Sequence, residues 1–249
     1  MSKYRLQFAW RTDTGRVRVH NEDAVSVHPD SRLVVIADGI GGASAGEVAS
    51  GFATQAVSDC FRNGRPLPQH KDEALERARD AVEAANQIIW DSARLTPRYA
   101  GMGTTVVVGY AGSDWLVFAH VGDSRLYRLR DGEIEQLTRD HSLIQDVVDQ
   151  GFFQSLEDAQ RYGINENILT RGLGTANPVV VDTGEADLRS GDLYLFCTDG
   201  LTGMVTDDGI RRILLTGGND LDRLSRLLVD LACEGGGLDN ITVALMRVS

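Results

Sequence analysis

The sequence has few cysteines and no long apolar run, and each shortage excludes a class of protein. Its 249 residues include three cysteines, none of which has C-x-x-C spacing: Cys60, Cys197 and Cys233. An odd and scattered set is typical of a reducing compartment rather than of a disulfide framework. No apolar run approaches the ~20 residues that span a bilayer, and the N-terminus lacks the apolar core of a signal peptide. We therefore expect a cytoplasmic protein without a membrane segment.

Positive charge is also scarce. Lysine and arginine together number 25 against 36 aspartates and glutamates, so the formal net charge is −11. Nucleic-acid binding depends on clustered positive charge, so this balance disfavours a nucleic-acid partner. The five histidines are scattered, and neither they nor the cysteines have the spacing of zinc ligands. The excess carboxylates mainly indicate solubility, and some of them are candidate metal ligands.

The expected strands and helices come in blocks rather than in alternating βαβ units. Strands are expected at 3–12, 24–28, 33–37, 103–111, 115–121, 124–129, 133–138, 179–182, 193–197 and 241–248, and helices at 45–61, 71–93, 206–215 and 221–233. Short turns between successive strands, with a hairpin signal at Asp131-Gly132, predict antiparallel pairing. The pattern favours one α+β domain over residues 1–249, with a polar and less regular insertion at 140–168.

Five acidic motifs share one form, in which an aspartate beside glycine or asparagine adjoins an apolar run. They are Asn21-Glu22-Asp23, Asp38-Gly39, Gly122-Asp123-Ser124, Thr198-Asp199-Gly200 and Asp239-Asn240. Any one of them is typical of a turn. Five at the ends of predicted core strands indicate convergence, and converging carboxylates repel each other unless cations are bound. Carboxylate and water ligands suit Mg²⁺ or Mn²⁺, and a pair of such ions would make a hydrolytic site for a phosphoryl group.

A phosphate also needs a positively charged partner. Arg18 precedes the Asn21-Glu22-Asp23 motif on the same segment, and a guanidinium can pair with two phosphate oxygens. Its position makes Arg18 the candidate, with Arg11 and Arg16 as nearby alternatives.

Eight motifs, taken together and in order, resemble those of the metal-dependent serine/threonine protein phosphatases of the 2C type. The chain is most similar to the compact bacterial members, and the resemblance covers about residues 18–242. The motifs are RVHNED (18–23), VVIADGIGG (34–42), GMGTT (101–105), HVGDSR (120–125), DHSL (140–143), LTRGLG (169–174), CTDGL (197–201) and GLDNIT (237–242).

The resemblance implies two stacked antiparallel β-sheets flanked by α-helices, an α-β-β-α sandwich, with two or three Mn²⁺ or Mg²⁺ ions in a cleft at one end. The implied ligands of the first two ions are the Asp38 carboxylate, which would bridge them, the Gly39 carbonyl, Asp199 and Asp239. Glu22 and Asp23 would act directly or through metal-bound water. Asp123, together with Asp199, would hold a weaker third ion. Arg18 would hold the substrate phosphate. The 140–168 insertion would be a flap beside the cleft.

The implied activity is direct attack by a metal-activated water on phosphoserine or phosphothreonine in proteins. The partners would be phosphorylated proteins, in particular a bacterial serine/threonine kinase and its targets, and we expect a monomer. Ile40 departs from many eukaryotic relatives, which carry a histidine there as proposed general acid. Because Ile40 cannot transfer a proton, the general acid is left unassigned.

Other functions are less well supported. A dinucleotide-binding G-x-G-x-x-G turn would need glycine at Ser44, and a cysteine-dependent phosphatase needs C-x₅-R, which none of the three cysteines begins. Gly122-Asp123-Ser124 is similar to the nucleophile block of GDSL-type esterases, but nothing marks the His–Asp pair that such a serine requires. The alternative that remains is a catalytically silent pseudophosphatase acting as a regulatory binding module.

Overall fold

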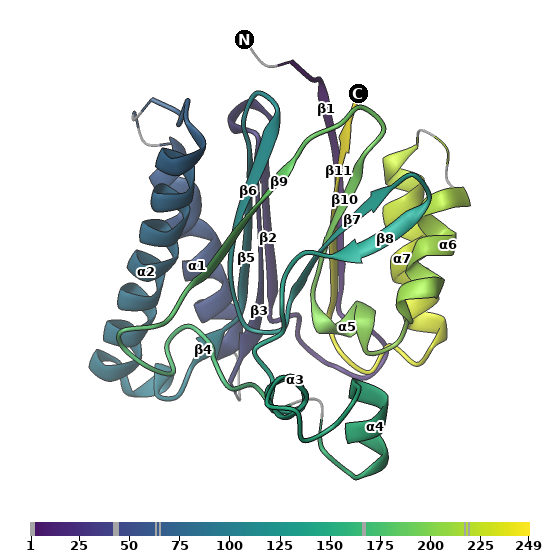
Figure 1. Cartoon of the computed structure of the whole chain (residues 1–249). Coiled ribbons are helices and arrows are strands. Elements are labelled where there is room, and N and C mark those ends of the chain that lie inside the picture. The colour runs from purple at the N-terminus through teal and green to yellow at the C-terminus, as the bar shows by residue number, and fades with distance from the viewer. Residues whose placement is uncertain are drawn as a thin grey trace.

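The computed structural model describes residues 3–41, 45–62, 64, 66–165, 168–216, 218 and 220–249. These residues form two antiparallel sheets that face each other, with helices on both outer sides (Figure 1). The α-β-β-α sandwich is therefore confirmed. Ser44 and the end of the glycine-rich turn lie outside the described residues.

The first sheet has the strand order β1-β11-β10-β7-β8. Its strands are β1 (Leu6–Asp13), β7 (Arg125–Arg130), β8 (Glu133–Gln136), β10 (Leu193–Cys197) and β11 (Ile241–Val248). Helices α6 (Asp207–Thr216) and α7 (Leu221–Glu234) cover its outer face, and the short α5 (Asp199–Thr202) follows β10 (Figure 1).

The second sheet has the order β2-β3-β5-β6-β9, with β4 paired to β3 off this path. Its strands are β2 (Asp23–His28), β3 (Leu33–Ile40), β4 (Gly103–Thr104), β5 (Val106–Ala111), β6 (Trp115–Val121) and β9 (Asp182–Asp187). Two long helices, α1 (Ala45–Arg62) and α2 (Lys71–Leu95), cover its outer face. The 3₁₀ turns η1 (Pro29–Ser31) and η2 (Pro97–Tyr99) complete this half.

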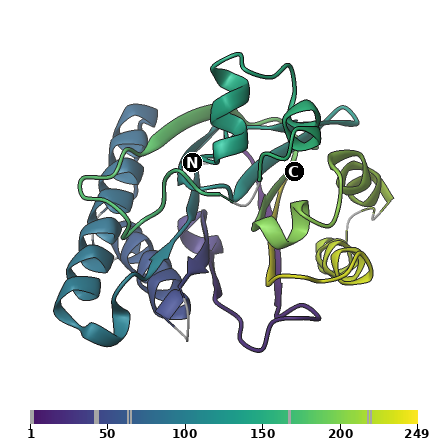
Figure 2. The same cartoon turned by 90° about the horizontal axis from the view of Figure 1, so that it is seen from below.

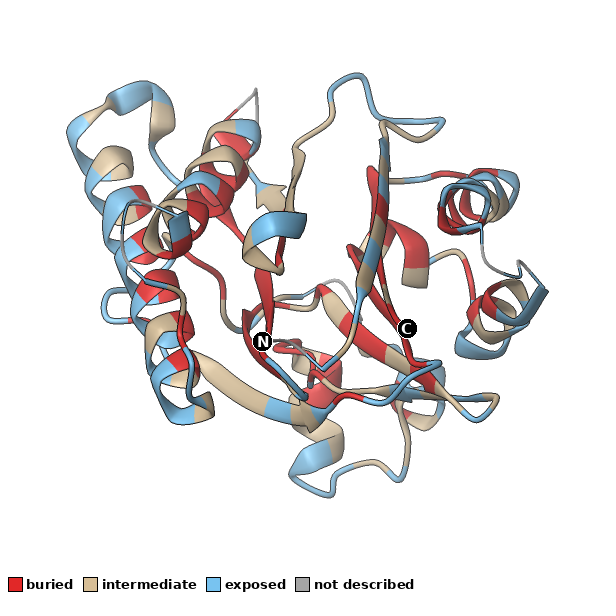
Figure 3. Ribbon diagram, turned by 90° about the horizontal axis from the view of Figure 1, so that it is seen from above, coloured by how far each residue is buried: buried red, intermediate tan, exposed pale blue. Residues whose placement is uncertain are grey.

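Three apolar layers hold the sandwich together, one between the sheets and one beneath each helix pair (Figure 3). The position of β3 explains why its sequence begins with a continuous apolar run. Leu33 and Val35 pack toward α1 and α2, whereas Val34 and Ile36 pack between the sheets. A strand buried on both faces needs a continuous apolar run rather than an alternating one. This rigid strand carries Asp38 at its end.

The Gly122-Asp123-Ser124 turn differs from the hairpin that its sequence suggests. Strand β6 pairs with β5 and β9, whereas β7 pairs with β8 and β10, so the turn carries the chain from one sheet to the other. The Asp131-Gly132 hairpin between β7 and β8 is confirmed.

The strand expected at 179–182 was placed too early, because β9 spans Asp182–Asp187. Its sequence, DTGEAD, is polar because β9 is an edge strand, which among the described strands pairs with β6 alone. The run expected at 103–111 is broken at Thr105, and the short α5 was not foreseen.

The 140–168 segment contains the short helices α3 (Leu143–Asp149) and α4 (Leu156–Arg161), and it lies at one end of the two sheets (Figure 2 views the molecule from that end). Its two ends meet through a bridge between Ser142 and Leu169. Within the described residues, every helix is too short or too polar to cross a membrane.

Candidate metal centre

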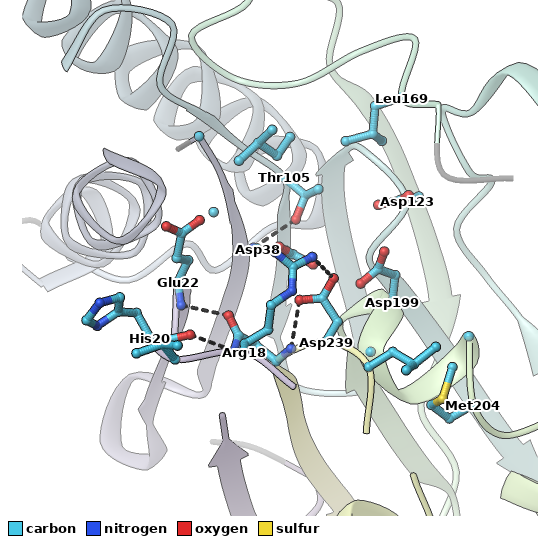
Figure 4. Close-up of a pocket in the computed structure, with 18 residues that line it drawn as sticks. Arg18, His20, Glu22, Asp38, Thr105, Asp123, Leu169, Asp199, Met204 and Asp239 are labelled. Atoms are coloured by element: carbon cyan, nitrogen blue, oxygen red, sulfur yellow. Dashed lines mark hydrogen bonds and ion pairs between the residues drawn. The ribbon is translucent and has the colours of Figure 1, made fainter. Parts of the chain in front are cut away.

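A cavity of about 810 Å³ opens at the end of the sandwich beside the 140–168 segment, and it collects most of the candidate residues (Figure 4). Seven of the eight line it: Arg18, Glu22, Asp38, Gly39, Asp123, Asp199 and Asp239. The eighth, Asp23, lies opposite Asp38 in the β2–β3 pair and interacts electrostatically with the Asp38 and Asp199 carboxyls. The acidic motifs therefore converge, as the sequence predicts.

The backbone of Asp38 is fixed by two threonines of the GMGTT motif. The Asp38 N–H donates to Thr105 Oγ1 at 2.9 Å, and the Asp38 carbonyl accepts from the Thr105 N–H at 2.9 Å and from Thr104 Oγ1 at 2.8 Å. Asp38 also lies opposite Asp23 of β2, so the Asp38 backbone is held from both sides and keeps a defined position. In the sequence this motif contributes only to the family resemblance, and its positioning role becomes evident from these contacts.

The opposite sheet supplies Asp199, at the start of α5, and Asp239, just before β11. A side chain at Gly200 would collide with the Asn240 carbonyl oxygen, which explains the glycine in Thr198-Asp199-Gly200. Close contact between these two segments brings both aspartates into one cleft.

Asn240 ties the Arg18 loop to this cleft. Its Oδ1 accepts from the Glu22 N–H at 2.8 Å, and its Nδ2 donates to the carbonyls of Thr14 and His20 at 2.9 Å each. The Asn240 N–H donates to Asp239 Oδ1 at 2.8 Å. The role of Asn240 is not evident from the sequence, where the Asp239-Asn240 pair marks only its position.

Four buried carboxyls of the site have raised pKa values: Asp23, Asp38, Asp123 and Asp199. Burial raises the pKa of Asp23 to about 7, and Asp199 and Asp239 add to this, while hydrogen bonds from Thr242 and Thr198 oppose it. Burial, followed by Asp199, raises the pKa of Asp123 to about 7. Burial and the neighbouring Asp23 and Asp199 raise the pKa of Asp38 well above its usual value. Without a counter-charge this cleft resists ionisation.

Two carboxyl oxygens in the described part of the chain, Asp23 Oδ1 and Asp199 Oδ1, are buried without a hydrogen-bond partner. Burying such groups costs free energy unless something compensates. Divalent cations would satisfy both the orphan oxygens and the raised pKa values. Hard oxygen donors of this kind suit Mg²⁺ or Mn²⁺, so the residues present fit the predicted ions.

Glu22 and His20 are less involved than the aspartates. In Figure 4 the Glu22 carboxylate points away from Asp199 and Asp239, and it lies beside Gly46 of α1. The His20 ring also points away from the aspartate cluster. The aspartates therefore form the centre of the candidate site.

Arg18 lies at the cleft as expected but pairs with an acid. Its terminal nitrogen donates to Asp239 Oδ2 at 2.6 Å, and the Arg18 side chain is 54% exposed. Exposed ion pairs contribute about 0–1 kcal/mol, so a phosphate or a cation could exchange with this contact at little cost.

Two histidines lie together, contrary to the scattered arrangement inferred from the sequence. His120 and His141 stack with ring centroids 4.7 Å apart, and with Asp182 they are close enough to surround an ion. However, the Gly122 N–H donates to His141 Nδ1 at 3.0 Å, so the neutral ring carries its proton on Nε2. Nε2 lies 3.3 Å from Asp182 Oδ2, an electrostatic contact without hydrogen-bond geometry. We therefore interpret this cluster as a hydrogen-bonded support rather than a ligand set.

Comparison with known proteins agrees with this geometry. Residues 15–223 match the family model described as Protein phosphatase 2C. The chain belongs to the protein phosphatase 2C family. This membership confirms the resemblance found in the eight motifs, and the sandwich is the fold of the family's solved structures.

Named relatives of this 2C-family chain are bacterial. It is 38% identical to the serine/threonine phosphatase Stp of Listeria monocytogenes, over 96% of this chain and 94% of that protein. It is 36% identical to the serine/threonine protein phosphatase PstP of Mycobacterium tuberculosis, over 98% of this chain. The chain spans 45% of the length of that PstP.

A crystal structure of the PstP catalytic domain in complex with two manganese ions superimposes on this 2C-family fold with a TM-score of 0.83. The two share 35% sequence identity, and the alignment covers 98% of each chain. The manganese ions belong to that structure.

Proposed function

We propose that this protein hydrolyses phosphoserine and phosphothreonine in proteins, using two or three Mn²⁺ or Mg²⁺ ions held in the acidic cleft. The observation that carries the proposal is the convergence of aspartates from both sheets, with two buried carboxyl oxygens left without partners. Family membership and the phosphatases named among the relatives support it. The manganese bound by PstP supports the choice of cation.

Asp38, Asp199 and Asp239 would hold the ions, with the Gly39 carbonyl, Asp23, Glu22 and Asp123 as further ligands, direct or through water. When bound, such ions lower the pKa of a water and stabilise charge on phosphoryl oxygens.

The chain's own residues orient the substrate. Arg18 binds the phosphate, since its guanidinium lies at the cleft mouth and offers several donors in one plane. Ile40 also lines the cleft and is 36% exposed, but it cannot donate a proton. The leaving alkoxide therefore takes its proton from another group.

The biological setting is also proposed. A bacterial serine/threonine kinase and its targets would supply the substrates, and residues 1–249 would act as one monomeric domain with 140–168 as a flap. The three cysteines form no disulfide in the described part of the chain, which fits the reducing conditions of a cytoplasm. Every acidic residue assigned to the ions is present in the chain, which disfavours the metal-free pseudophosphatase.

The test is hydrolysis of p-nitrophenyl phosphate and of a phosphothreonine peptide by the EDTA-treated protein, with and without Mn²⁺. We expect Mn²⁺ to restore activity, Asp38→Asn to lower kcat by about 10³-fold, and Cys197→Ser to retain most activity. A phosphotyrosine peptide of the same sequence controls for substrate class. Full activity in excess EDTA, or loss of activity only in the cysteine variant, would contradict the proposal.

A further inference from the structure

The turn that carries Asp123 is held by a residue from a distant part of the chain. We propose that His141 is a positioning residue that fixes the Gly122-Asp123 turn and thereby connects the base of the 140–168 segment to the cation site. This inference rests on the proposed function, because the position of Asp123 matters for activity only if cations bind in the cleft.

His141 holds both backbone polar groups of Gly122. The His141 N–H donates to the Gly122 carbonyl at 3.0 Å, and the Gly122 N–H donates to His141 Nδ1 at 3.0 Å. Gly122 lies where the chain leaves one sheet for the other, so it has no ladder partner of its own. Buried backbone groups require partners, and here a single residue supplies both.

The conformation of Gly122 makes this support necessary. Its φ of +108° is one that residues with a side chain rarely adopt, and a Cβ there would lie 2.5 Å from Thr105 Cγ2. Glycine is conformationally permissive, so the turn itself does not determine where Asp123 points. External hydrogen bonds must do so.

His141 is itself held in one orientation. Its side chain is 2% exposed, it stacks on the nearly buried His120, and its Nε2 faces Asp182, whose other oxygen accepts from Arg171 at 2.7 Å. Burial and the adjacent His120 lower the pKa of His141 to about 4, so the ring is neutral and Nδ1 keeps its lone pair. The acceptor presented to Gly122 is therefore constant at neutral pH.

The other flank of the turn is tied to Asp38. Ser124 Oγ lies 2.7 Å from Thr105 Oγ1, and the same Thr105 oxygen accepts from the Asp38 N–H. Asp123 thus lies between an anchor on the Asp38 strand and an anchor on His141. Loss of the His141 anchor would leave Asp123 attached to the site from one side only.

His141 also belongs to the junction that closes the 140–168 segment. The Thr170 N–H donates to the His141 carbonyl at 2.9 Å, and the Leu143 N–H donates to the Ile168 carbonyl at 2.8 Å. A displacement of this segment would therefore move His141 and, through its two hydrogen bonds, Gly122.

Two matched substitutions separate the hydrogen bond from the packing. His141→Phe keeps a ring against His120 but removes the acceptor, whereas His141→Asn loses the ring but keeps an acceptor oxygen near the position of Nδ1. The first readout is amide hydrogen exchange of Gly122 in the metal-free protein. The second readout is Mn²⁺ binding measured by titration calorimetry, which separates tight from weak sites.

We expect His141→Phe to accelerate exchange of the Gly122 amide by more than tenfold and to weaken the weakest Mn²⁺ site by about tenfold, with the tighter sites unchanged. His141→Asn should stay close to wild type in both readouts. The proposal would be overturned if the Gly122 amide exchanged at the same rate in His141→Phe and wild type. It would also be overturned if both variants lost the same amount of Mn²⁺ affinity and of Gly122 protection. If the wild-type protein binds no Mn²⁺, the proposed function fails, while the exchange readout still tests the anchor.

A second substitution covers the case in which His141→Phe does not fold. Asp182→Ala leaves the His141 ring in place but removes the carboxylate that faces His141 Nε2, together with its ion pair to Arg171, at a residue whose side chain is 42% exposed. It should accelerate Gly122 exchange, whereas Asp187→Ala, on the same strand, should not. Identical exchange in these two variants would overturn the proposal.

Discussion

Arg18 occupies a position between two possible partners. In this structure it pairs with Asp239, and the proposed substrate phosphate would compete for the same guanidinium. Because this exposed pair contributes about 0–1 kcal/mol, losing it should disturb cation binding little. Losing a charge-assisted contact to phosphate should cost more.

We therefore predict that Arg18→Ala raises KM for a phosphothreonine peptide by about tenfold or more, a loss of about 1.4 kcal/mol, with a smaller change in the Mn²⁺ concentration needed for half activity. Steady-state kinetics at several Mn²⁺ concentrations measures both. Arg16→Ala is the matched control, since Arg16 is exposed and does not line the cleft. An unchanged KM for Arg18→Ala would assign the phosphate to another group.

The buried carboxyl of Asp23 acts against folding at neutral pH when no cation is present. Its pKa is raised from 3.8 to about 7, so between these values the folded protein binds a proton that the unfolded chain has lost. Stability therefore falls as the pH rises through this window, and the full cost is present above about pH 7.

We predict that, in EDTA, the melting temperature of Asp23→Asn rises relative to wild type as the pH goes from 4.5 to 8. The histidines titrate in both proteins, so their contribution cancels in this difference. Thermal unfolding followed by circular dichroism gives the measurement. A difference that does not change with pH would show that Asp23 is ionised throughout.

The acids of this site could be predicted from the sequence because each stands at the end of an apolar run beside a turn residue. Asn240, Thr105 and His141 could not be predicted in the same way. Their roles depend on hydrogen bonds between segments more than 18 residues apart, and no local pattern encodes those.

At the scale of elements, the 140–168 segment is joined to β7 by a nearly buried ion pair. Arg125 Nε donates to both Asp140 oxygens at 3.0 Å, and its terminal nitrogen donates to Oδ2 at 2.7 Å. Gln136 also donates to Asp140, which is 8% exposed. Removing one partner of such a pair leaves a charge without compensation.

We predict that Asp140→Ala destabilises the protein by about 3 kcal/mol, which lowers the melting temperature by roughly 6–12 °C in a domain of this size. Arg212→Ala, which removes an exposed pair with Asp208, should change stability by no more than about 0.5 kcal/mol. Thermal unfolding of both variants makes the comparison. Equal shifts would mean that the buried pair contributes no more than a surface pair.

Helices and central strands could be predicted to within a few residues because their apolar patterns are strong. The crossing at Gly122-Asp123-Ser124 could not, since a short turn between two strands does not encode whether those strands share a sheet. Strand β9 was misplaced because an edge strand exposes most of its side chains and so lacks an apolar pattern.

For the whole molecule, the proposed cations would connect the two sheets. Asp38 comes from the second sheet, whereas Asp199 and Asp239 adjoin strands of the first. A ligand that binds only the folded state adds about 2.7 kcal/mol of stability at roughly 100 times its Kd.

We predict that saturating Mn²⁺ raises the melting temperature of the EDTA-treated protein by roughly 5–10 °C. Asp239→Asn should show a clearly smaller rise, and matched ionic strength in NaCl should give none. Differential scanning calorimetry is the measurement. The same rise in the variant and the wild type would place the stabilising ion elsewhere.

The stacking of two sheets could not be derived from periodicity, because an alternating pattern identifies a buried face without identifying what covers it. It came from the resemblance of the motifs to a known family.

The pairing of β1 with β11 has a consequence for how the protein is made. These strands lie at opposite ends of the described chain, in a register that runs from Leu6 opposite Val248 to Asp13 opposite Ile241. Translation delivers residues in order at about 5–20 per second. Until β11 emerges, the strand edges of β1 and β10 that pair with it therefore lack their hydrogen-bond partner. Asp239 arrives with it. A ribosome-bound chain that stops short of β11 therefore cannot complete the acidic cleft, and the proposed activity would begin only after these residues have been made.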